Sequence, residues 1–586
     1  MNSVGWLQLL LLAAGLLIIT KPLGIYLLKV LDPDQGGRTF LEPILGSVER
    51  LIYTICQVDR RRQQNWKQYA VAMLVFSAVG MLLTYGLLRL QDKLPLNPQN
   101  LPAVPDTLAF NTAASFTANT CWQSYGGEGT MSYFSQMVAL ASQNFMSSAV
   151  GLAVCAGLVR GIARRSSREI GNFWVDITRV CLYLFIPVCI LYALYFVASG
   201  SPQNFHAYTA AGVVDQSAAA STTQPVVQNI VQGPIASLAA IKMFGVDGDG
   251  YVNANAAHPF ENCSPLSDFI MVVAFLSVGF SLTYYLGRMV KNQRHGWACW
   301  AVIASLMFTS MIGLWYFEAQ PNPRLAEMGI SPLNANMEGK EVRFGIFRSA
   351  EFGAGTTAAG CGAVNSMHDS YTPMGGFIPL FNQHLGEIIP GGIGSGLCGF
   401  LVYVFVAVFI AGLMIGRTPE YLGKKIDAYD VKLAALYLLA PVFACLAFTG
   451  WAAISDWGIA GLNNNGPHGF SELLYAYTSA SANNGSAFGG LTCTPANGDR
   501  HYNATMAIAI LVGRYFQLVP ILALAGALAL KKPTPASAGS FPVTGFTFGL
   551  LVACVILIVG ALNFLPSLAL GPIVEHFIMR GSALTY

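Results

Sequence analysis

The sequence predicts an all-α polytopic membrane protein in which four helix–pore-loop–helix repeats surround a pseudo-fourfold axis, with one further helix at each end. Three observations predict this fold. Of the 586 residues, 54% are hydrophobic and only 10% are charged, whereas a soluble chain carries roughly 25% charged residues. Ten apolar runs are long enough to cross a bilayer. Four segments of small residues recur along the chain at nearly equal intervals.

The apolar runs predict ten membrane-spanning helices, because a helix needs about 20 such residues to cross the hydrocarbon core. The first run has neither the charged start nor the small-residue cleavage site of a signal peptide, so we expect it to be retained. The runs lie near 4–20, 69–90, 137–159, 178–198, 269–287, 297–317, 397–415, 433–454, 505–530 and 545–565.

Lys and Arg gather on one side of the predicted membrane. The connectors after odd-numbered spans hold 22 of them and the other connectors hold 9, while Arg514 lies within a span. Because positively charged loops stay in the cytoplasm, the sequence predicts that both termini are extracytoplasmic. The net charge is only +3, which excludes a nucleic-acid partner and leaves the lipid bilayer as the main surroundings.

Each of four long outside segments contains one stretch of small and hydroxylated residues. With Thr120, Asp247, Cys361 and Asn484 as markers, the stretches recur after 127, 114 and 123 residues. This spacing indicates an internal fourfold repeat of two spans and a loop. The predicted repeats are 66-165, 172-294, 297-416 and 431-532, and the extra terminal helices lie in 1-31 and 545-566.

A stretch too short to cross the bilayer precedes each small-residue segment. Non-helical backbone at membrane depth is tolerated only where protein buries it or where it lines an aqueous path, so we expect four re-entrant half-helices. Their negative dipole ends and the main-chain carbonyls that follow favour dehydration and passage of a monovalent cation. For any single stretch, close helix packing is the alternative. The expected half-helices are 108–116, 234–244, 347–357 and 471–479.

Five stretches carry a resemblance to a known family. The chain resembles the A subunit of the bacterial Kdp potassium-importing P-type ATPase, a relative of the Trk/Ktr/HKT potassium transporters, over essentially its whole length. The matching stretches are NTAASFTANTCWQSYGGEG (111–129), NANAAHPFEN (253–262), GCGAVNSMHDSYTPMGG (360–376), FIAGLMIGRTPEYLGKKI (409–426) and ASANNGSAFGGL (480–491).

The resemblance implies a K⁺ selectivity filter built from three consecutive residues of each repeat. It also implies that Gln123 tunes affinity and selectivity, and that the charge of Arg514 below the filter restricts passive leak. For Arg514, an ion pair with an unseen carboxylate is the alternative. The implied filter residues are Asn119, Thr120 and Cys121, then Val246, Asp247 and Gly248, then Gly360, Cys361 and Gly362, and finally Asn483, Asn484 and Gly485.

The sequence departs from the family's pattern in the first two repeats. Cys121 stands where Asn is usual, Val246-Asp247-Gly248 stands for Thr-Asn-Gly, and Asp249 stands for glycine. Coordination by carbonyls tolerates such changes, so the potassium assignment is retained. The two carboxylates are expected to alter the usual affinity and rubidium discrimination.

The chain has no D-K-T-G phosphorylation motif and no Walker lysine loop, so it is not expected to hydrolyse ATP on its own. The resemblance implies a non-hydrolytic member of a K⁺-transporting translocase in the bacterial inner membrane. K⁺ is then the transported ligand for high-affinity uptake, and the chain needs no cofactor. ATP and Mg²⁺ would bind only to the partner, the P-type ATPase that forms the B subunit of the Kdp complex. The C subunit and the small single-span F subunit would complete that complex.

Two other functions stay open. A stand-alone Trk/Ktr-type transporter would need no hydrolase, although the extra terminal spans and the connector GRTPEYLGKK (416–425) resemble the Kdp protein. A membrane redox enzyme is suggested only by 12 Cys and 8 His, which form no C-x-x-C or H-E-x-x-H motif. We interpret GRTPEYLGKK as a docking surface, with solvated charge as the alternative, and PGGIGSGLCG (390–399) as broken helix near a gate.

Overall fold

The computed structural model describes residues 1–214, 227–323, 328–329, 335–414, 416, 418–494, 500–532 and 541–581. Within these residues ten helices are long and apolar enough to cross a membrane, which confirms the predicted spans. They are α1 (Ser3–Leu31), α4 (Trp66–Arg89), η2–α7 (Ser135–Ala163), α8–η3–α9 (Phe173–Ala198), α11 (Pro265–Met289), α12 (Gln293–Glu318), α16 (Ser395–Met414), α17 (Ala428–Ala453), α20 (His501–Leu530) and α21–η7–α22 (Phe546–Met579).

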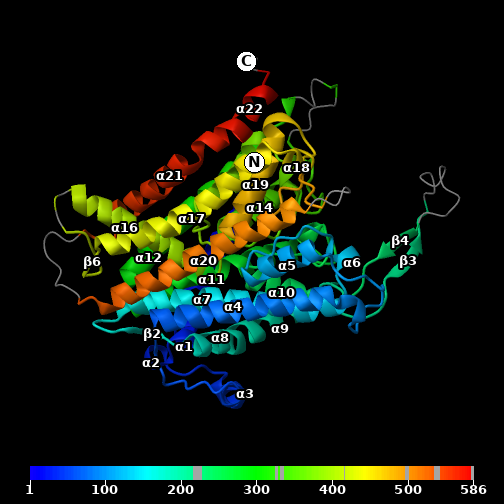
Figure 1. Cartoon of the computed structure of the whole chain (residues 1–586). Coiled ribbons are helices and arrows are strands. Elements are labelled where there is room, and N and C mark those ends of the chain that lie inside the picture. Colours follow the sequence, from blue (N-terminus) through cyan, green and yellow to red (C-terminus); the bar gives the residue numbers. More distant parts are fainter. Residues whose placement is uncertain are drawn as a thin grey trace.

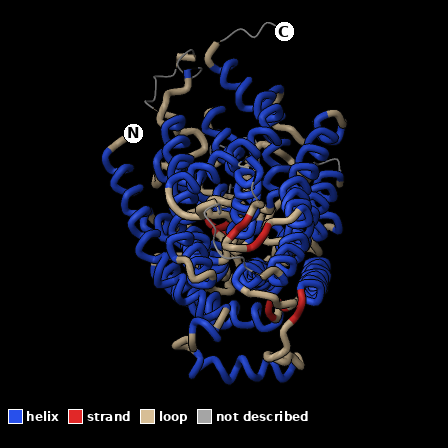
Figure 2. The backbone as a smooth tube through the Cα atoms, turned by 90° about the vertical axis from the view of Figure 1, so that its left-hand side faces the viewer, coloured by secondary structure: helices blue, strands red, loops and turns tan. Residues whose placement is uncertain are grey.

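The spans run roughly alongside one another in a single bundle (Figure 1), and a view turned by 90° looks along it (Figure 2). Several spans are longer than predicted. The first continues past Lys21 and Pro22 to Leu31, because Lys21 is exposed and so does not interrupt the helix. The last continues through a break at Gly571 to Met579.

Four short helices lie among the spans and are buried over most of their length. They are the expected half-helices: α5 (Asp106–Thr117), α10 (Ile235–Phe244), α14 (Gly345–Ala359) and α19 (Gly466–Ala482). Three of them extend beyond the expected stretch at both ends, and α10 begins one residue later than expected. The structure therefore confirms the all-α class with a short helix and a loop between successive spans.

The remaining elements are shorter than the spans, and among them α15 (Pro373–His384) packs inside the bundle against α12, α14 and α19. Three two-stranded antiparallel pairs are formed by β1 (Gln64–Asn65) with β2 (Glu169–Gly171), β3 (Thr209–Gly212) with β4 (Val227–Ile230), and β5 (Glu420–Tyr421) with β6 (Lys424–Lys425). The β3–β4 pair projects from one end of the bundle (Figure 1). The other helices are α2 (Pro33–Gly36), α3 (Glu42–Ile55), η1 (Gln91–Lys93), α6 (Gly127–Thr130), η5 (Asn255–Ala257), η6 (His368–Ser370) and α18 (Asp456–Ile459).

The GRTPEYLGKK connector forms the β5–β6 hairpin, with Arg417 outside the described residues. Lys424 is buried, and its ammonium donates to the carbonyls of Gly161 and Leu528 at 2.8 and 2.7 Å. This lysine therefore ties the ends of α7 and α20 together, because cations are favourable at helix C-termini. Lys425 is exposed and lies 3.8 Å from the Asp427 carboxylate, and docking of a partner at this hairpin stays a prediction.

A buried ion-pair network joins five helices at the basic end of the bundle. The Arg160 guanidinium on α7 contacts Asp32, which follows α1, at 2.8 Å and Asp176 of α8 at 2.7 Å. The hydroxyls of Tyr69 and Tyr285 donate to Asp176 and Asp32 at 2.8 and 2.6 Å. Because buried charges are stable only when their hydrogen bonds are satisfied, this network fixes the positions of α1, α4, α7, α8 and α11.

We expect Asp176→Ala to destabilise the protein by about 3–5 kcal/mol, because it leaves the Arg160 guanidinium buried without its bidentate partner. The measurement is the unfolding midpoint of purified protein in detergent. The control Asp34→Ala removes an exposed carboxylate of nearby α2 and should change stability by less than about 0.5 kcal/mol. Equal effects of the two substitutions would contradict the role assigned to the network.

Candidate ion-binding site

The four loops after the short helices share one backbone conformation. In each loop the first and third residues have positive φ, although four of these eight residues are not glycine. The first residues are Asn119 (57°), Val246 (58°), Gly360 (67°) and Asn483 (65°), and the third are Cys121 (53°), Gly248 (82°), Gly362 (80°) and Gly485 (93°). A left-handed conformation is costly for non-glycine residues, so its recurrence indicates that the surrounding structure imposes it.

The amide groups of these loops point back at the short helices. In every repeat the second residue donates its N–H to a carbonyl five residues earlier: Thr120 to Ser115 (3.0 Å), Asp247 to Lys242 (2.9 Å), Cys361 to Thr356 (3.0 Å) and Asn484 to Ser479 (2.9 Å). Because the C=O and N–H of a trans peptide point in opposite directions, the carbonyl of each first residue points away from its helix. The loops thus present carbonyl oxygens on the side away from α5, α10, α14 and α19.

The third residues show that the four loops meet in a closed ring. A Cβ added to Gly248 would lie 1.5 Å from the carbonyl oxygen of Cys361, one on Gly362 would lie 2.4 Å from that of Asn484, and one on Gly485 would lie 1.6 Å from that of Thr120. Repeat two therefore contacts repeat three, three contacts four, and four contacts one. Only glycine allows these approaches.

Two asparagines complete the ring. The Asn119 side-chain amide donates to the carbonyl of Val246 at 3.1 Å and so joins repeats one and two. The Asn483 amide donates to the Thr120 hydroxyl at 2.9 Å and joins repeats four and one. The structure thus brings the implied filter residues of all four repeats together around one centre.

Gln123 holds the first two repeats together on one side of the ring. Its side-chain amide donates to the carbonyl of Gly250 at 2.9 Å, and its carbonyl oxygen accepts from the Gly250 N–H at 2.8 Å. Both ends of the amide are thereby bonded to backbone. Gln123 acts on the filter by fixing the spacing of two loops, and its influence on affinity remains a prediction.

The two unusual carboxylates lie behind the ring, against α7. Asp247 accepts from the Ser148 hydroxyl at 3.1 Å, and Asp249 accepts from the Asn144 amide at 2.7 Å. Ser148 also donates to Asn119 at 2.9 Å. The carboxylates therefore support the first two loops from one face of α7 and place acidic groups beside the carbonyl ring.

A small closed cavity lies directly beneath the ring, with a volume of about 10 Å³, enough for one water-sized species. The implied residue Arg514 is one of its walls, and its guanidinium donates to the carbonyl of Ser147 at 3.0 Å. Among the described residues no carboxylate lies within 4.0 Å of this guanidinium, so they offer no direct ion pair, and the role of Arg514 stays a prediction. The cavity is lined by Asn119, Gly360, Gly386, Glu387, Gly392, Ser395, Tyr437, Ala482, Asn483, Arg514, Gln517 and Leu518.

Glu387 is a cavity residue that the sequence reasoning missed. One carboxylate oxygen lies 2.5 Å from where a Cβ on Gly360 would be, directly under the third loop. The other oxygen has no hydrogen-bond partner within the described part of the chain. The only sequence signal is an acid in the otherwise uncharged stretch between α15 and α16. That stretch is non-helical from 385 to 394, so the glycine-rich segment predicted as broken helix (390–399) is non-helical in its first half and forms the start of α16 in its second.

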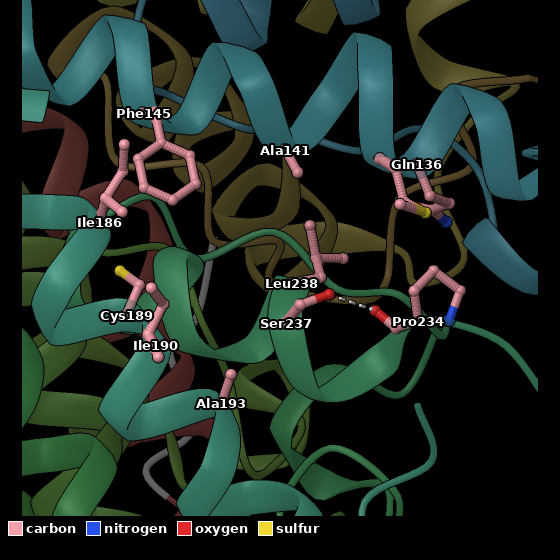
Figure 3. Close-up of a pocket in the computed structure, with 11 residues that line it drawn as sticks. Gln136, Ala141, Phe145, Ile186, Cys189, Ile190, Ala193, Pro234, Ser237 and Leu238 are labelled. Carbon is pink, nitrogen blue, oxygen red and sulfur yellow. Dashed lines mark hydrogen bonds between the residues drawn. The ribbon is translucent and has the colours of Figure 1, made fainter. Parts of the chain in front are cut away.

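Two further cavities lie near the ring. One of about 30 Å³ shares Gly386, Tyr437, Ala482 and Gln517 with the cavity beneath the filter and continues sideways to Asn563 and Phe564 of α21. Another, of about 240 Å³, lies between α7, α9 and α10 and shares no residue with either (Figure 3). The first extends the site laterally, whereas the second is an apolar hollow behind the second short helix.

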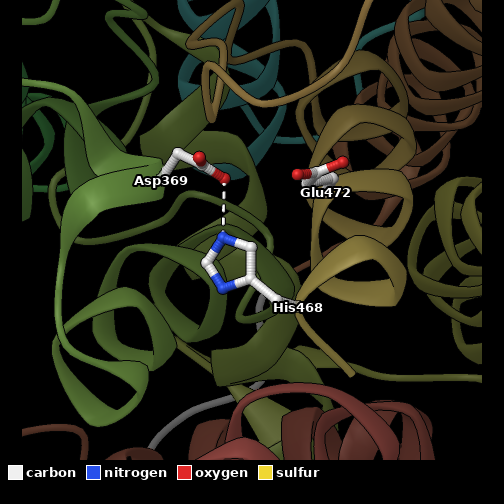
Figure 4. A group of neighbouring side chains, drawn as sticks. All are labelled: Asp369, His468 and Glu472. Atoms are coloured by element: carbon white, nitrogen blue, oxygen red, sulfur yellow. Dashed lines mark hydrogen bonds and ion pairs between the residues drawn. The ribbon is translucent and has the colours of Figure 1, made fainter. Parts of the chain in front are cut away.

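The outer ends of the third and fourth repeats are joined by a histidine between two acids. The imidazole nitrogens of His468 contact Asp369 at 2.9 Å and Glu575 at 2.7 Å, and Glu472 lies close by (Figure 4). Burial lowers the pKa of His468, but hydrogen bonds and charges from the two acids outweigh it and raise the pKa to about 10. Because both ring nitrogens are occupied, the group is an ion-paired imidazolium and not a metal ligand set.

Comparison with known proteins assigns the family. Residues 10–577 match the family described as "Potassium-transporting ATPase A subunit". The chain belongs to this family. Two relatives named "Potassium-transporting ATPase potassium-binding subunit" come from Methylobacterium nodulans, 52% identical over 98% of both chains, and Bradyrhizobium diazoefficiens, 50% identical over 99% of both.

Among solved structures, the potassium transporter TrkH from Vibrio parahaemolyticus is similar at a TM-score of 0.49 and 13% identity, covering 88% of this chain and 96% of that one. This likeness is weak, and membership of the A subunit family rests on the sequence relatives.

For this A subunit we expect Gly485→Ala to abolish stabilisation by K⁺, because the new methyl group would overlap the Thr120 carbonyl and open the ring. The measurement is the shift of the unfolding midpoint on adding K⁺ to the purified chain. The matched control is Gly345→Ala, where φ is also positive (65°) but no atom lies within 4 Å. If both variants lose the response equally, backbone strain and not ring closure is responsible.

We expect protonated His468 to stabilise the outer ends of repeats three and four. Because the folded-state pKa is raised from 6.5 to about 10, this contribution is fully present below pH 6.5 and is lost as pH rises through about 10. The unfolding midpoint of the wild type should therefore fall steadily between about pH 6.5 and about pH 10 and level off above that, and His468→Asn should lack that pH-dependent step. His206→Gln, at an exposed site, should retain it, and persistence of the step in His468→Asn would refute the assignment.

Proposed function

We propose that this chain is the potassium-binding and translocating component of an ATP-driven, high-affinity K⁺ uptake complex of the bacterial inner membrane, with both termini outside. The observation that carries the proposal is the closed ring of four loops whose amides are bonded to short helices and whose carbonyls are left for an ion. Such carbonyls replace the hydration shell of a monovalent cation. Relatives about half identical to this chain bear the name of a potassium-binding subunit.

The proposed path begins outside, at the ring. K⁺ loses its hydration shell among Asn119–Cys121 and the equivalent residues of the other repeats. The four repeats in this proposal have the boundaries that the sequence predicts. It then pauses in the cavity beside Glu387 and Arg514. From there the lateral cavity toward Asn563 and Phe564 offers a route sideways, because the positive charge of Arg514 opposes straight passage.

The energy comes from another polypeptide. The chain has no D-K-T-G sequence at which a P-type ATPase is phosphorylated, so ATP and Mg²⁺ bind to a P-type ATPase partner that corresponds to the Kdp B subunit. Partners corresponding to the Kdp C and F subunits complete the proposed complex. The role of this chain is to select K⁺ and deliver it to the ATPase.

The proposal is tested by K⁺-stimulated ATP hydrolysis in the complex that copurifies with this chain. We expect Gly362→Asp to raise the K⁺ concentration for half-maximal hydrolysis by about tenfold or more, because it places a side chain 2.4 Å from the Asn484 carbonyl and distorts the ring. Gln123→Arg should do the same by releasing Gly250. Gly345→Ala serves as the control that leaves the K⁺ response unchanged.

Two results of this experiment would contradict the proposal. If no ATPase copurifies and the chain alone passes K⁺ in liposomes, the stand-alone Trk/Ktr-type transporter replaces the proposal. If ATPase activity copurifies but the filter variants respond to K⁺ as the wild type does, the ring is not the site that sets K⁺ dependence.

A further inference from the structure

The helix α3 does not run with the spans. It follows α1 and lies outside the bundle, below α8 in Figure 1. Figure 2 looks along the spans, and there α3 is the helix that runs lengthwise across the bottom of the picture, at the height that α3 has in Figure 1. A helix that crosses the direction of the spans at their basic end lies along the membrane surface.

One residue fixes the inner face of α3 to the bundle. The Glu49 carboxylate accepts from Arg179 at 3.0 Å, from the Tyr183 hydroxyl at 2.6 Å and from the Tyr53 hydroxyl at 2.9 Å. Glu49 is buried together with Gly46 and Tyr53. The orientation of the helix about its own axis is therefore set.

That orientation turns an apolar stripe outward. Ile44, Val48, Leu51 and Ile55, spaced by four, three and four residues, are 72%, 42%, 59% and 72% exposed. This spacing keeps them on one helix face, opposite the face that holds Glu49. An exposed apolar stripe on a strongly amphipathic helix is the pattern of a segment that lies in the lipid interface.

Next to the stripe, a cavity of about 840 Å³ is lined by three arginines, Arg38, Arg50 and Arg60. None of the three forms an ion pair in the part of the chain that the structure describes. The Thr39 side chain also lines the cavity, is 3% exposed, and its hydroxyl has no hydrogen-bond partner among the described residues. The three guanidinium groups and the Thr39 hydroxyl are hydrogen-bond donors, and together they indicate that the cavity binds an anion.

Two carboxylates line the same cavity as the arginines, so the ligand must suit acidic as well as basic groups. Glu42 and Asp59 also line it, and Asp59 accepts from the Arg61 N–H at 2.9 Å. With the exposed Arg61 and Arg62 at the rim, the surroundings remain positive. A ligand that offers a phosphate to the guanidinium groups and a hydroxyl to Glu42 satisfies both kinds of group.

We propose that α3 and this cavity bind an anionic phospholipid of the leaflet on the basic side of the membrane, with phosphatidylglycerol as the fitting headgroup. Arg38, Arg50 and Arg60 hold the phosphodiester, since guanidinium groups match phosphate oxygens in bidentate geometry. The stripe lies among the acyl chains beside it. Glu49 holds α3 in this orientation through its bonds with Arg179 and Tyr183.

The first test is lipid retention by the full-length protein, purified together with the partner proteins that copurify with it and studied by native mass spectrometry. We expect the wild type to retain phosphatidylglycerol and the variant Arg38→Gln/Arg50→Gln/Arg60→Gln to retain about tenfold less, since each basic group contributes to binding at an anionic surface. The control Arg61→Gln/Arg62→Gln removes charge at the rim only and should lose far less. Equal loss of phosphatidylglycerol in the two variants would mean that general surface charge holds the lipid, and it would overturn the proposed site.

Two further arms separate the sources of the ligand. Phosphatidylcholine and millimolar inorganic phosphate should not displace phosphatidylglycerol, and displacement by inorganic phosphate alone would assign the cavity to a free anion. Folding of each variant is checked by an unfolding midpoint equal to that of the wild type.

The second test identifies what covers the stripe. A benzoylphenylalanine photocrosslinker at position 48, in native membranes, should give a lipid adduct of this chain, whereas the same group at position 61 should not. A crosslink from position 48 to another protein or to a second copy of the chain would overturn the lipid proposal and identify a protein interface.

Discussion

The structure depends on how polar backbone is satisfied at membrane depth. In hydrocarbon an unpaired peptide group costs several kcal/mol, yet a filter needs carbonyls with no protein partner. The four loops meet both demands by bonding their amides to the helix that precedes them, as Thr120 does to Ser115 and Asn484 does to Ser479. The carbonyl on the other side of each peptide then points away from the helix, and among the described residues only that of Val246 also accepts from a side chain, the Asn119 amide at 3.1 Å. The short helices, their burial and the spans around them follow from that requirement.

The same requirement explains why the repeats tolerate unequal side chains. Ligands supplied by the main chain depend on dihedral angles, and Cys121 adopts a positive φ of 53° although the other three repeats place glycine there. Its thiol contacts Asn144 at 3.5 Å, and the same asparagine donates to Asp249. The departures in repeats one and two are thus linked through one side chain of α7. They form a single local change that leaves the ring intact and makes its surroundings more acidic.

Composition and spacing predicted the parts of the fold that depend on local chemistry. The ten spans follow from apolar length, and the four short helices follow from the regular spacing of the small-residue segments after them, because lipid leaves few alternatives. The end of α1 did not follow, since Lys21 and Pro22 end the apolar run, whereas the helix continues past them with the Lys21 side chain exposed. The resemblance placed the filter residues, but not the directions of their side chains. The bond of Gln123 to Gly250 and the burial of Asp247 against Ser148 join residues about 100 or more positions apart, so no local pattern could give them.

Below the ring, the charges favour a turn over a straight descent. Arg514 is 4% exposed and its Nε has no partner among the described residues, so water screens its positive charge little in a medium of low dielectric constant. Glu387 lines the same cavity from the loop between α15 and α16. On the proposed path, a cation that leaves the carbonyls is repelled by Arg514 along the axis and attracted by Glu387, beside the Gly386 and Tyr437 wall that the two cavities share. Such an arrangement would hold the ion in place until a neighbouring protein takes it, as the proposed delivery of K⁺ to a separate ATPase requires.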